Sequence, residues 1–404
     1  MFALPGDYNI TMPVQNMTQL EPQSAEFAIS DRSRQFRQLF FPSASEEDWC
    51  DWRWQLRHRL REEDDLAKVF ELSPDERQAL TRPGRAFPVS ITPYYASLLD
   101  RTDPLSALRR TMLPVPDEFV ASHGEMSDPL AEDRHSPVPG IVHRYPDRVL
   151  FLVTDFCPVY CRYCTRSRLV GGNAEFDINL EQWQRGIDYI AETKSVRDVL
   201  VSGGDPLIYS DERLDWLLQR LHAIPHLDMI RIGTKIPLAM PQRVTPALCE
   251  MLRRYHPLYV SLHATHPDEL TLESIQACER LADAGIPIGS QTVLLKGVND
   301  DPEIIRRLMH ELLKVRVRPY YLLQCDPITG SAHFRTRVDS GVEIIAQLRG
   351  HTSGYAVPHF IVDTPDGGGK FSLVPAHIDG RDGDDLLITN YEGRNGFRYP
   401  DPVG

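Results

Sequence analysis

From residue 149 onward the chain alternates strand-like and helix-like segments, and this alternation limits the folds it can adopt. Short apolar runs rich in Val, Ile, Leu and Tyr recur at 149–153, 196–202, 229–234, 258–263, 286–294, 320–325 and 359–364. Amphipathic stretches with helical spacing separate most of them, at 180–193, 212–223, 246–255, 269–284 and 303–315. Continuous apolar strands are typical of a parallel sheet buried on both faces. Six or seven such units predict an α/β fold with a full or partial barrel, whose functional groups lie at the C-terminal ends of the strands.

The rest of the chain divides around this barrel. We expect an irregular N-terminal arm over 1–40, which is polar and lacks periodicity, and a helical accessory region over 41–146. Within the accessory region one helix is predicted after Ser45 and a second at Ser73, both typical capping residues. The barrel is assigned to 147–375, and the Gly- and Asp-rich hairpins of 376–404 are expected to form a small C-terminal closing segment.

Charge and composition exclude several classes of protein. The chain has 44 Lys and Arg against 57 Asp and Glu, a net charge of −13, which argues against non-specific nucleic-acid binding. No apolar run approaches the length of a membrane helix, and 1–17 lacks the basic and apolar pattern of a secretion signal. The number of cysteines, seven, is odd and does not suit a secreted disulfide scaffold. We therefore predict a cytoplasmic protein that binds neither nucleic acid nor membranes.

Three cysteines follow the first predicted barrel strand directly, as Cys157-x3-Cys161-x2-Cys164. A structural zinc site would need a fourth Cys or His at a matching spacing, and none follows in this loop. Thiolate ligands suit an iron–sulfur cluster instead, and three of them leave one iron of a four-iron cluster open to a substrate. The other four cysteines are isolated in the sequence and are expected to be packed as small apolar side chains: Cys50, Cys249, Cys278 and Cys325.

Over about 45–375 the chain resembles the lysine 2,3-aminomutase family of radical S-adenosylmethionine (SAM) enzymes. The resemblance rests on HRYPDRVLFLVTDFC (143–157), CRYCTRSR (161–168), DVLVSGGDPL (198–207), RIGTKIPLAMPQR (231–243), LLKGVNDD (294–301), RPYYLLQCD (318–326), HFRT (333–336), LRGHTSGYAVP (348–358) and VDTPDGGGK (362–370). It implies a partial (β/α)6 barrel, a [4Fe–4S] cluster with a reducing electron donor, SAM and pyridoxal 5′-phosphate. It also implies migration of an α-amino group to the β carbon, for which a cofactor-derived radical removes the β hydrogen.

The resemblance assigns roles to individual residues. Cys157, Cys161 and Cys164 would hold the cluster, and the Ser202-Gly203-Gly204-Asp205 turn matches the motif that contacts the methionine amino group of SAM. Lys370, which follows PDGGG, matches the lysine that binds pyridoxal phosphate covalently. Arg144 and Arg148 match the arginines that contact the cofactor phosphate, for which a guanidinium fork is well suited.

The expected substrate is a basic amino acid. Arg166 matches the residue that pairs with the substrate carboxylate, and Asp326 and Asp363 match two acids that hold a distal cation. Two carboxylates buried together are costly unless a cation lies between them. L-Lysine is our first prediction. L-Arginine is the alternative, because Leu323 replaces a common Tyr and Asp366 adds an acid near the expected pocket. A third reading is a radical SAM enzyme with another hydrogen-abstraction reaction.

Two expectations concern assembly. Some relatives bind zinc between subunits through a cysteine-rich C-terminal tail and a cysteine after VND. Here Asp301 takes that place and no cysteine follows Cys325, so we predict no zinc. We expect a homo-oligomer that assembles through the N-terminal helices and arm.

Overall fold

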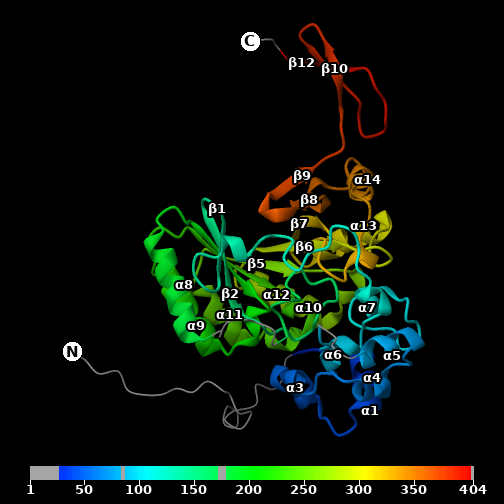
Figure 1. The fold of residues 1–404 in the computed structure, drawn as a ribbon, viewed down its shortest axis with the longest axis vertical. Coiled ribbons are helices and arrows are strands. Elements are labelled where there is room, and N and C mark those ends of the chain that lie inside the picture. The colour runs from blue at the N-terminus through cyan, green and yellow to red at the C-terminus, as the bar shows by residue number, and fades with distance from the viewer. Residues whose placement is uncertain (1–26, 83–86, 172–178, 402–404) are drawn as a thin grey trace, which may run out of the picture.

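A curved sheet of nine strands forms the centre of the computed structural model, which describes residues 27–82, 87–171 and 179–401 (Figure 1). The strands pair in chain order: β1 (Ile141–Tyr145), β2 (Arg148–Thr154), β3 (Asp198–Gly203), β4 (Met229–Thr234), β5 (Leu258–His263), β6 (Ile288–Leu294), β7 (Val317–Gln324), β8 (His359–Thr364) and β9 (Gly369–Leu373). From β2 to β8 every pairing is parallel, whereas β1 and β9 pair antiparallel at the two edges.

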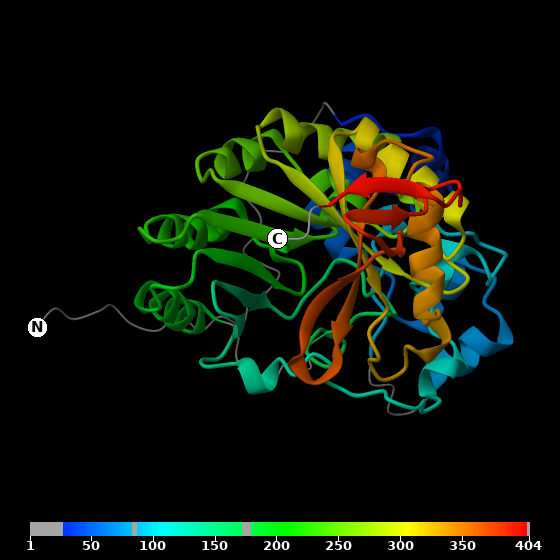
Figure 2. The same cartoon turned by 90° about the horizontal axis from the view of Figure 1, so that it is seen from above.

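A long helix follows each of the parallel strands β2 to β7 and leads to the next strand. These helices are α8 (Leu180–Glu192), α9 (Asp211–His222), α11 (Pro246–Arg253), α12 (Leu272–Asp283), α13 (Pro302–Lys314) and α14 (Val338–Leu348). Figure 2 shows them on the outer side of the curved sheet. In α13, Asp301 caps the first turn, Pro302 occupies the first position, and a stripe containing Ile305 and Leu312 is buried. The six βα units and the further strand β8 confirm the predicted partial barrel.

The N-terminal helices pack together beside the barrel (Figure 1). They are α1 (Asp31–Phe40), α2 (Glu46–Cys50), α3 (Trp52–Arg57), α4 (Glu63–Val69), α5 (Pro74–Thr81), α6 (Pro93–Ala96) and α7 (Ala107–Arg110). The predicted helix at Ser73 is confirmed as α5, with a complete capping box. The helix predicted after Ser45 is instead divided at Asp51, whose extended backbone ends α2. The Asp51 side chain then caps α3 by accepting hydrogen bonds from the backbone N–H groups of Arg53 and Trp54.

The predicted irregular arm is helical in its last ten residues, as α1 shows. Ser30 caps this helix, and the ring of Phe36 packs 6.3 Å from that of Trp49. The polar composition concealed this helix, because only one of its faces is buried. The first 26 residues of the arm lie outside the described residues.

The C-terminal segment forms a second, antiparallel sheet of β10 (Ile378–Asp382), β11 (Asp385–Ile388) and β12 (Phe397–Pro400). This sheet projects away from the barrel (Figure 1). The ring of Tyr391 meets that of His351, after α14, at 5.2 Å. Among the residues described, no helix is both long enough and apolar enough to cross a lipid bilayer.

Candidate active site

The three clustered cysteines lie in a tight loop after β2, at the C-terminal edge of the parallel strands. The backbone N–H of Cys164 donates to the carbonyl of Cys161 at 3.0 Å, and Tyr160 is tied to Ser90 of the accessory region at 3.0 Å. All three thiols are free, and burial raises the pKa of Cys164 to about 11. A thiolate at such a position needs a bound cation, as a metal cluster supplies.

The cysteine loop offers three free thiols as ligands for an iron–sulfur cluster. In the described part of the chain, no three His, Cys, Asp or Glu side chains are arranged to hold one metal ion. The thiolate ligands of a multi-iron cluster each bind a different iron, so they need not converge on one point. Cys157 and Cys164 also pack against the buried rings of Phe87 and Tyr160, an apolar cover of the kind that limits solvent access to a cluster.

The Ser202–Asp205 turn packs directly against the chain that enters the cysteine loop. Gly203 has a φ of +114°, and a Cβ there would lie 2.3 Å from the carbonyl oxygen of Thr154. A Cβ on Gly204 would lie 2.3 Å from the carbonyl oxygen of Phe156. Both positions therefore require glycine, which lets the turn approach the residues just before Cys157.

Asp205 has a structural function in addition to its predicted role. Its buried carboxylate accepts hydrogen bonds from the Thr234 hydroxyl and the Lys235 backbone N–H, each at 2.7 Å. Burial raises the pKa of Asp205 to about 6, although these bonds oppose the shift. These bonds use both carboxylate oxygens, so Asp205 fixes the turn to the end of β4.

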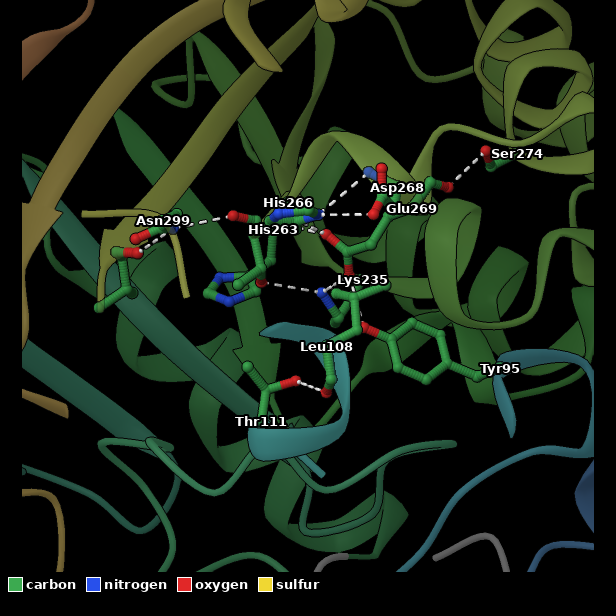
Figure 3. A network of polar contacts seen from close by, with 12 residues as sticks. Tyr95, Leu108, Thr111, Lys235, His263, His266, Asp268, Glu269, Ser274 and Asn299 are labelled. Carbon is green, nitrogen blue, oxygen red and sulfur yellow. Dashed lines mark hydrogen bonds and ion pairs between the residues drawn. The ribbon is translucent and has the colours of Figure 1, made fainter. Parts of the chain in front are cut away.

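A buried polar network surrounds Lys235 and Glu269 (Figure 3). Lys235, at the end of β4, forms an ion pair with Glu269, and Tyr95 of α6 donates to the same carboxylate at 2.7 Å. Lys235 is 7% exposed and Glu269 is 0% exposed. Burial alone would raise the pKa of Glu269, but Lys235 reverses the shift and lowers it. The network therefore holds a charged pair between the barrel and the accessory region.

The same network reaches the aromatic residue between the cluster cysteines. Lys235 Nζ donates to Thr265 Oγ1 at 3.1 Å, and the Tyr163 hydroxyl lies 2.7 Å from Thr265 Oγ1 and 2.9 Å from His263 Nε2. The rings of Tyr163 and His263 stack at 5.7 Å. Sequence reasoning missed Lys235, His263 and Glu269, because only the fold brings these distant positions together.

Lys370 lies on the edge strand β9, directly opposite Asp363 of β8, and the two side chains form an ion pair. Its backbone N–H donates to the Tyr145 hydroxyl at 2.9 Å, and Arg144 Nε donates to the carbonyl of Gly367. Residues of β1 therefore support the glycine turn that leads to Lys370.

Arg148 reaches this region through Tyr145. Its guanidinium lies 3.8 Å from the centre of the Tyr145 ring and also pairs with Asp147 at 2.8 Å. Tyr145 was not predicted as a site residue, although its place within HRYPDR, between the two predicted arginines, was a signal that could have found it. The arrangement offers Lys370 as a nucleophile and two guanidinium groups for an anionic ligand, which fits pyridoxal phosphate.

Asp326, just after β7, belongs to the same charged region. Burial, and to a smaller extent the nearby Asp363, raise the pKa of its carboxyl to about 6, against the opposing effects of Thr165, Lys370 and Arg166. The Thr165 hydroxyl donates to Asp326 at 2.9 Å. The structure thus brings the two predicted substrate acids into electrostatic contact.

Arg166 already has a carboxylate partner. Its Nε and Nη2 donate to the two carboxylate oxygens of Glu132 at 3.1 Å and 2.6 Å. Burial would lower the pKa of Arg166, but Glu132 and other nearby anions raise it. Glu132 was not predicted as a site residue, because no motif joins positions 34 residues apart.

Asp366 does not add an acid to the pocket, as the arginine alternative supposed. It is exposed, with a φ of +58°, and its carboxylate pairs with Arg134 at 2.9 Å. Leu323 is half-buried in β7, where it pairs with Ile361 of β8. One of the two observations that favoured L-arginine is therefore lost.

Comparison with known proteins agrees with this geometry. Residues 151–309 match the family described as Radical SAM superfamily, and 345–403 match the family described as Lysine-2,3-aminomutase. The chain is 48% identical to an L-lysine 2,3-aminomutase of Fusobacterium nucleatum over 357 residues, which cover 88% of this chain and 84% of that protein. It is 42% identical to a glutamate 2,3-aminomutase of Clostridioides difficile over 352 residues, which cover 87% and 83% of the two chains.

Among solved structures, Streptococcus suis SuiB bound to S-adenosylmethionine aligns with a TM-score of 0.41 and 16% identity, over 54% of this chain and 51% of that one. The barrel, its cysteine loop and the family match define a radical SAM enzyme. Within that class, the chain belongs to the lysine 2,3-aminomutase family and is an isomerase of the aminomutase type. Membership of this class implies SAM and an iron–sulfur cluster.

Proposed function

We propose that the enzyme is a pyridoxal-phosphate-dependent 2,3-aminomutase that moves the α-amino group of a basic L-amino acid, L-lysine first, to the β carbon. The observation that carries the proposal is the cluster of Asp326, Asp363 and Lys370. Asp363 and Lys370 pair across β8 and β9, and Asp326 is close enough to Asp363 for its pKa to rise. This region combines a nucleophilic lysine with two acids that need a cation.

The cofactors would divide the chemistry between the two ends of the site. Cys157, Cys161 and Cys164 would hold the [4Fe–4S] cluster, and the turn from Ser202 to Asp205 would contact SAM. When bound, SAM and the cluster supply the radical that removes a hydrogen, and pyridoxal phosphate stabilises the migrating amino group. Lys370 would bind pyridoxal phosphate covalently, with Arg144 and Arg148 oriented to hold its phosphate by charge-assisted hydrogen bonds.

Charge supports a substrate with a distal cation. Arg166 would bind the α-carboxylate, and Asp326 and Asp363 would bind the distal ammonium. A glutamate side chain would instead bring a third carboxylate to these two acids, which is unfavourable in a buried site. The glutamate 2,3-aminomutase of C. difficile shows that identity of about 42% alone does not decide the substrate. Asp326 and Asp363 indicate the substrate class more strongly than overall sequence identity does.

L-Arginine remains the second candidate because half-buried Leu323 could leave room for a longer side chain. The test is anaerobic incubation of the reconstituted enzyme with dithionite, SAM, pyridoxal phosphate and each of L-lysine, L-arginine and L-glutamate. We expect β-lysine as the main product, detected by mass spectrometry. Faster formation of β-arginine would select the alternative. Absence of every β-amino acid, with SAM still cleaved, would favour a different hydrogen-abstraction reaction.

We also propose a cytoplasmic homo-oligomer that receives electrons from a reducing donor. The exposed apolar side chains of the C-terminal segment support self-association: Ile378, Tyr391, Phe397 and Tyr399 are each at least 49% exposed. This surface adds to the N-terminal helices as a candidate contact between copies. Light scattering of the intact protein measures the assembly, and a monomer at all concentrations would contradict it.

A further inference from the structure

Both carboxylate oxygens of Glu132 bind one residue of the proposed substrate site, Arg166. It accepts hydrogen bonds from Arg166 Nε at 3.1 Å and Nη2 at 2.6 Å, and it is only 6% exposed. A guanidinium has two edges that can each bind a carboxylate, Nε with Nη2 and Nη1 with Nη2. Glu132 takes the first edge. Among the described residues, Nη1 has no hydrogen-bond partner.

The loop that carries Glu132 is itself fixed. The Asp128 carboxylate accepts hydrogen bonds from the backbone N–H groups of Glu132 and Asp133, both at 3.0 Å. Arg168 pairs with Asp133 at 3.0 Å, which adds a tie between this loop and the cysteine loop. These contacts hold the Glu132 carboxylate in place before any substrate binds, so little entropy is lost in orienting Arg166.

The same loop also supports the turn that leads to Lys370. The backbone N–H of Asp366 donates to the carbonyl of Pro129 at 3.0 Å, and Arg134 pairs with Asp366 at 2.9 Å. The segment 128–136 therefore contacts both Arg166 and the approach to Lys370. It is well placed to set the separation between a carboxylate on Arg166 and an amino group at Lys370.

We propose that Glu132 is a positioning residue, which holds the Nε–Nη2 edge of Arg166 so that the Nη1–Nη2 edge binds the substrate carboxylate. This inference rests on the proposed function in one respect, the assignment of Arg166 to that carboxylate. The ion pair acts through Arg166, and Glu132 does not touch the reacting atoms. Glu132 would serve any α-amino acid substrate, whereas Asp326 and Asp363 select the side chain.

The kinetic test compares wild type with Glu132→Gln and Glu132→Asp in the reconstituted holoenzyme. Glu132→Gln replaces one acceptor by an NH2 group that opposes the guanidinium, so we expect the KM for L-lysine to rise roughly tenfold or more, with a smaller change in kcat. Glu132→Asp keeps the charge and should recover part of the loss. Inhibition by 1,5-diaminopentane, which has no carboxylate, should be the same in all three proteins.

Glu76→Gln is the matched control. Glu76 binds Arg109 in the same mode, at 2.8 Å to Nε and 2.7 Å to Nη2, but within the accessory region. This variant should lose stability and keep the wild-type KM. An unchanged KM in Glu132→Gln would overturn the proposal. So would an equal loss of affinity for L-lysine and for 1,5-diaminopentane in that variant. A lower KM would overturn it too, because Glu132 would then compete with the substrate.

A crystal structure of Glu132→Gln separates this proposal from the proposed function. We expect the Arg166 guanidinium to leave its position in the variant, and a guanidinium that stays in place would refute the positioning role. If wild type converts none of the three amino acids, the proposed function fails, while this structural comparison still decides whether Glu132 positions Arg166.

Discussion

Lys370 and Asp363 lie opposite each other on the antiparallel strands β9 and β8, and their side chains form an ion pair. The pairing means that one residue proposed to hold a cofactor also neutralises one residue proposed to hold the substrate. If Lys370 is committed to pyridoxal phosphate, Asp363 and the nearby Asp326 need another cation. The distal ammonium of a basic amino acid meets that requirement, so cofactor and substrate binding should be linked through these residues.

Substrate binding should depend on the ionisation of Asp326. Its pKa is raised from 3.8 to about 6, first by burial and then by Asp363, so a large fraction is protonated below that pH. A cation binds to the ionised form, and kcat/KM for L-lysine should therefore fall as the pH drops through about 6. In Asp326→Asn the KM should rise roughly tenfold or more, because one charged hydrogen bond is lost, and this inflection should disappear. A retained inflection would assign it to another group, such as Asp205.

The same shift has a consequence for stability, with a definite sign. The folded protein keeps the Asp326 proton up to about pH 6, whereas the unfolded chain releases it near 3.8. This group therefore favours the fold at low pH, and its contribution is lost as the pH rises between those two values. Asp326→Asn should flatten the pH dependence of the melting temperature in that range. An identical pH profile in wild type and variant would contradict the assignment.

The fold was largely predictable because each barrel strand is a local, continuous apolar run. The strand predicted at 149–153, for example, is present in the structure as β2 and is buried on both faces. Cys157, Cys161 and Cys164 were equally local. In contrast, the pairs Arg166–Glu132 and Lys235–Glu269 join positions that are each 34 residues apart, and no periodicity in the sequence connects them. Only the packing of loops at one edge of the sheet creates such pairs.

The direction of individual side chains was the other feature that the sequence could not show. Asp366 was expected near the substrate, yet its φ of +58° and its pairing with Arg134 direct the carboxylate to the surface. Removal of this acid in Asp366→Gly should therefore leave the ratio of kcat/KM for L-lysine and L-arginine unchanged, and should alter stability by about 1 kcal/mol or less. Parallel assays with both amino acids test this. A changed ratio of kcat/KM for the two amino acids would indicate that Asp366 does contribute to the substrate pocket.

Lys370→Ala should abolish cofactor attachment and aminomutase activity. The proposed covalent bond needs the side-chain amine of Lys370, which alanine lacks. The visible absorbance of the bound cofactor, measured after removal of free pyridoxal phosphate, should disappear. Lys314→Ala is the control, because Lys314 lies exposed on α13 and, among the residues that the structure describes, forms its ion pair with Glu311. Equal absorbance in Lys370→Ala and wild type would contradict the proposal.

Cys161→Ala should prevent assembly of the iron–sulfur cluster. A cluster with only two protein ligands is poorly held, so iron and acid-labile sulfide should fall well below the wild-type content after anaerobic reconstitution. Cys325→Ala removes a buried thiol that packs in the same small apolar cluster as Tyr163. This variant should retain the wild-type content of iron and acid-labile sulfide. Equal loss of iron and sulfide in the two variants would indicate a packing defect.

Breaking the buried pair of Lys235 and Glu269 by removing one partner should lower the free energy of unfolding by several kilocalories per mole, although neither residue is assigned to substrate. Lys235→Met leaves the fully buried Glu269 carboxylate without its cation, which costs about 3–5 kcal/mol in comparable sites. The double variant Lys235→Met/Glu269→Gln carries no buried charge and should recover part of that loss. Urea unfolding of the wild type, both single variants and the double variant measures the coupling. If the losses in unfolding free energy of the two single variants simply add in the double variant, the two residues are not coupled. The buried polar network around them then does not depend on the charge of this pair.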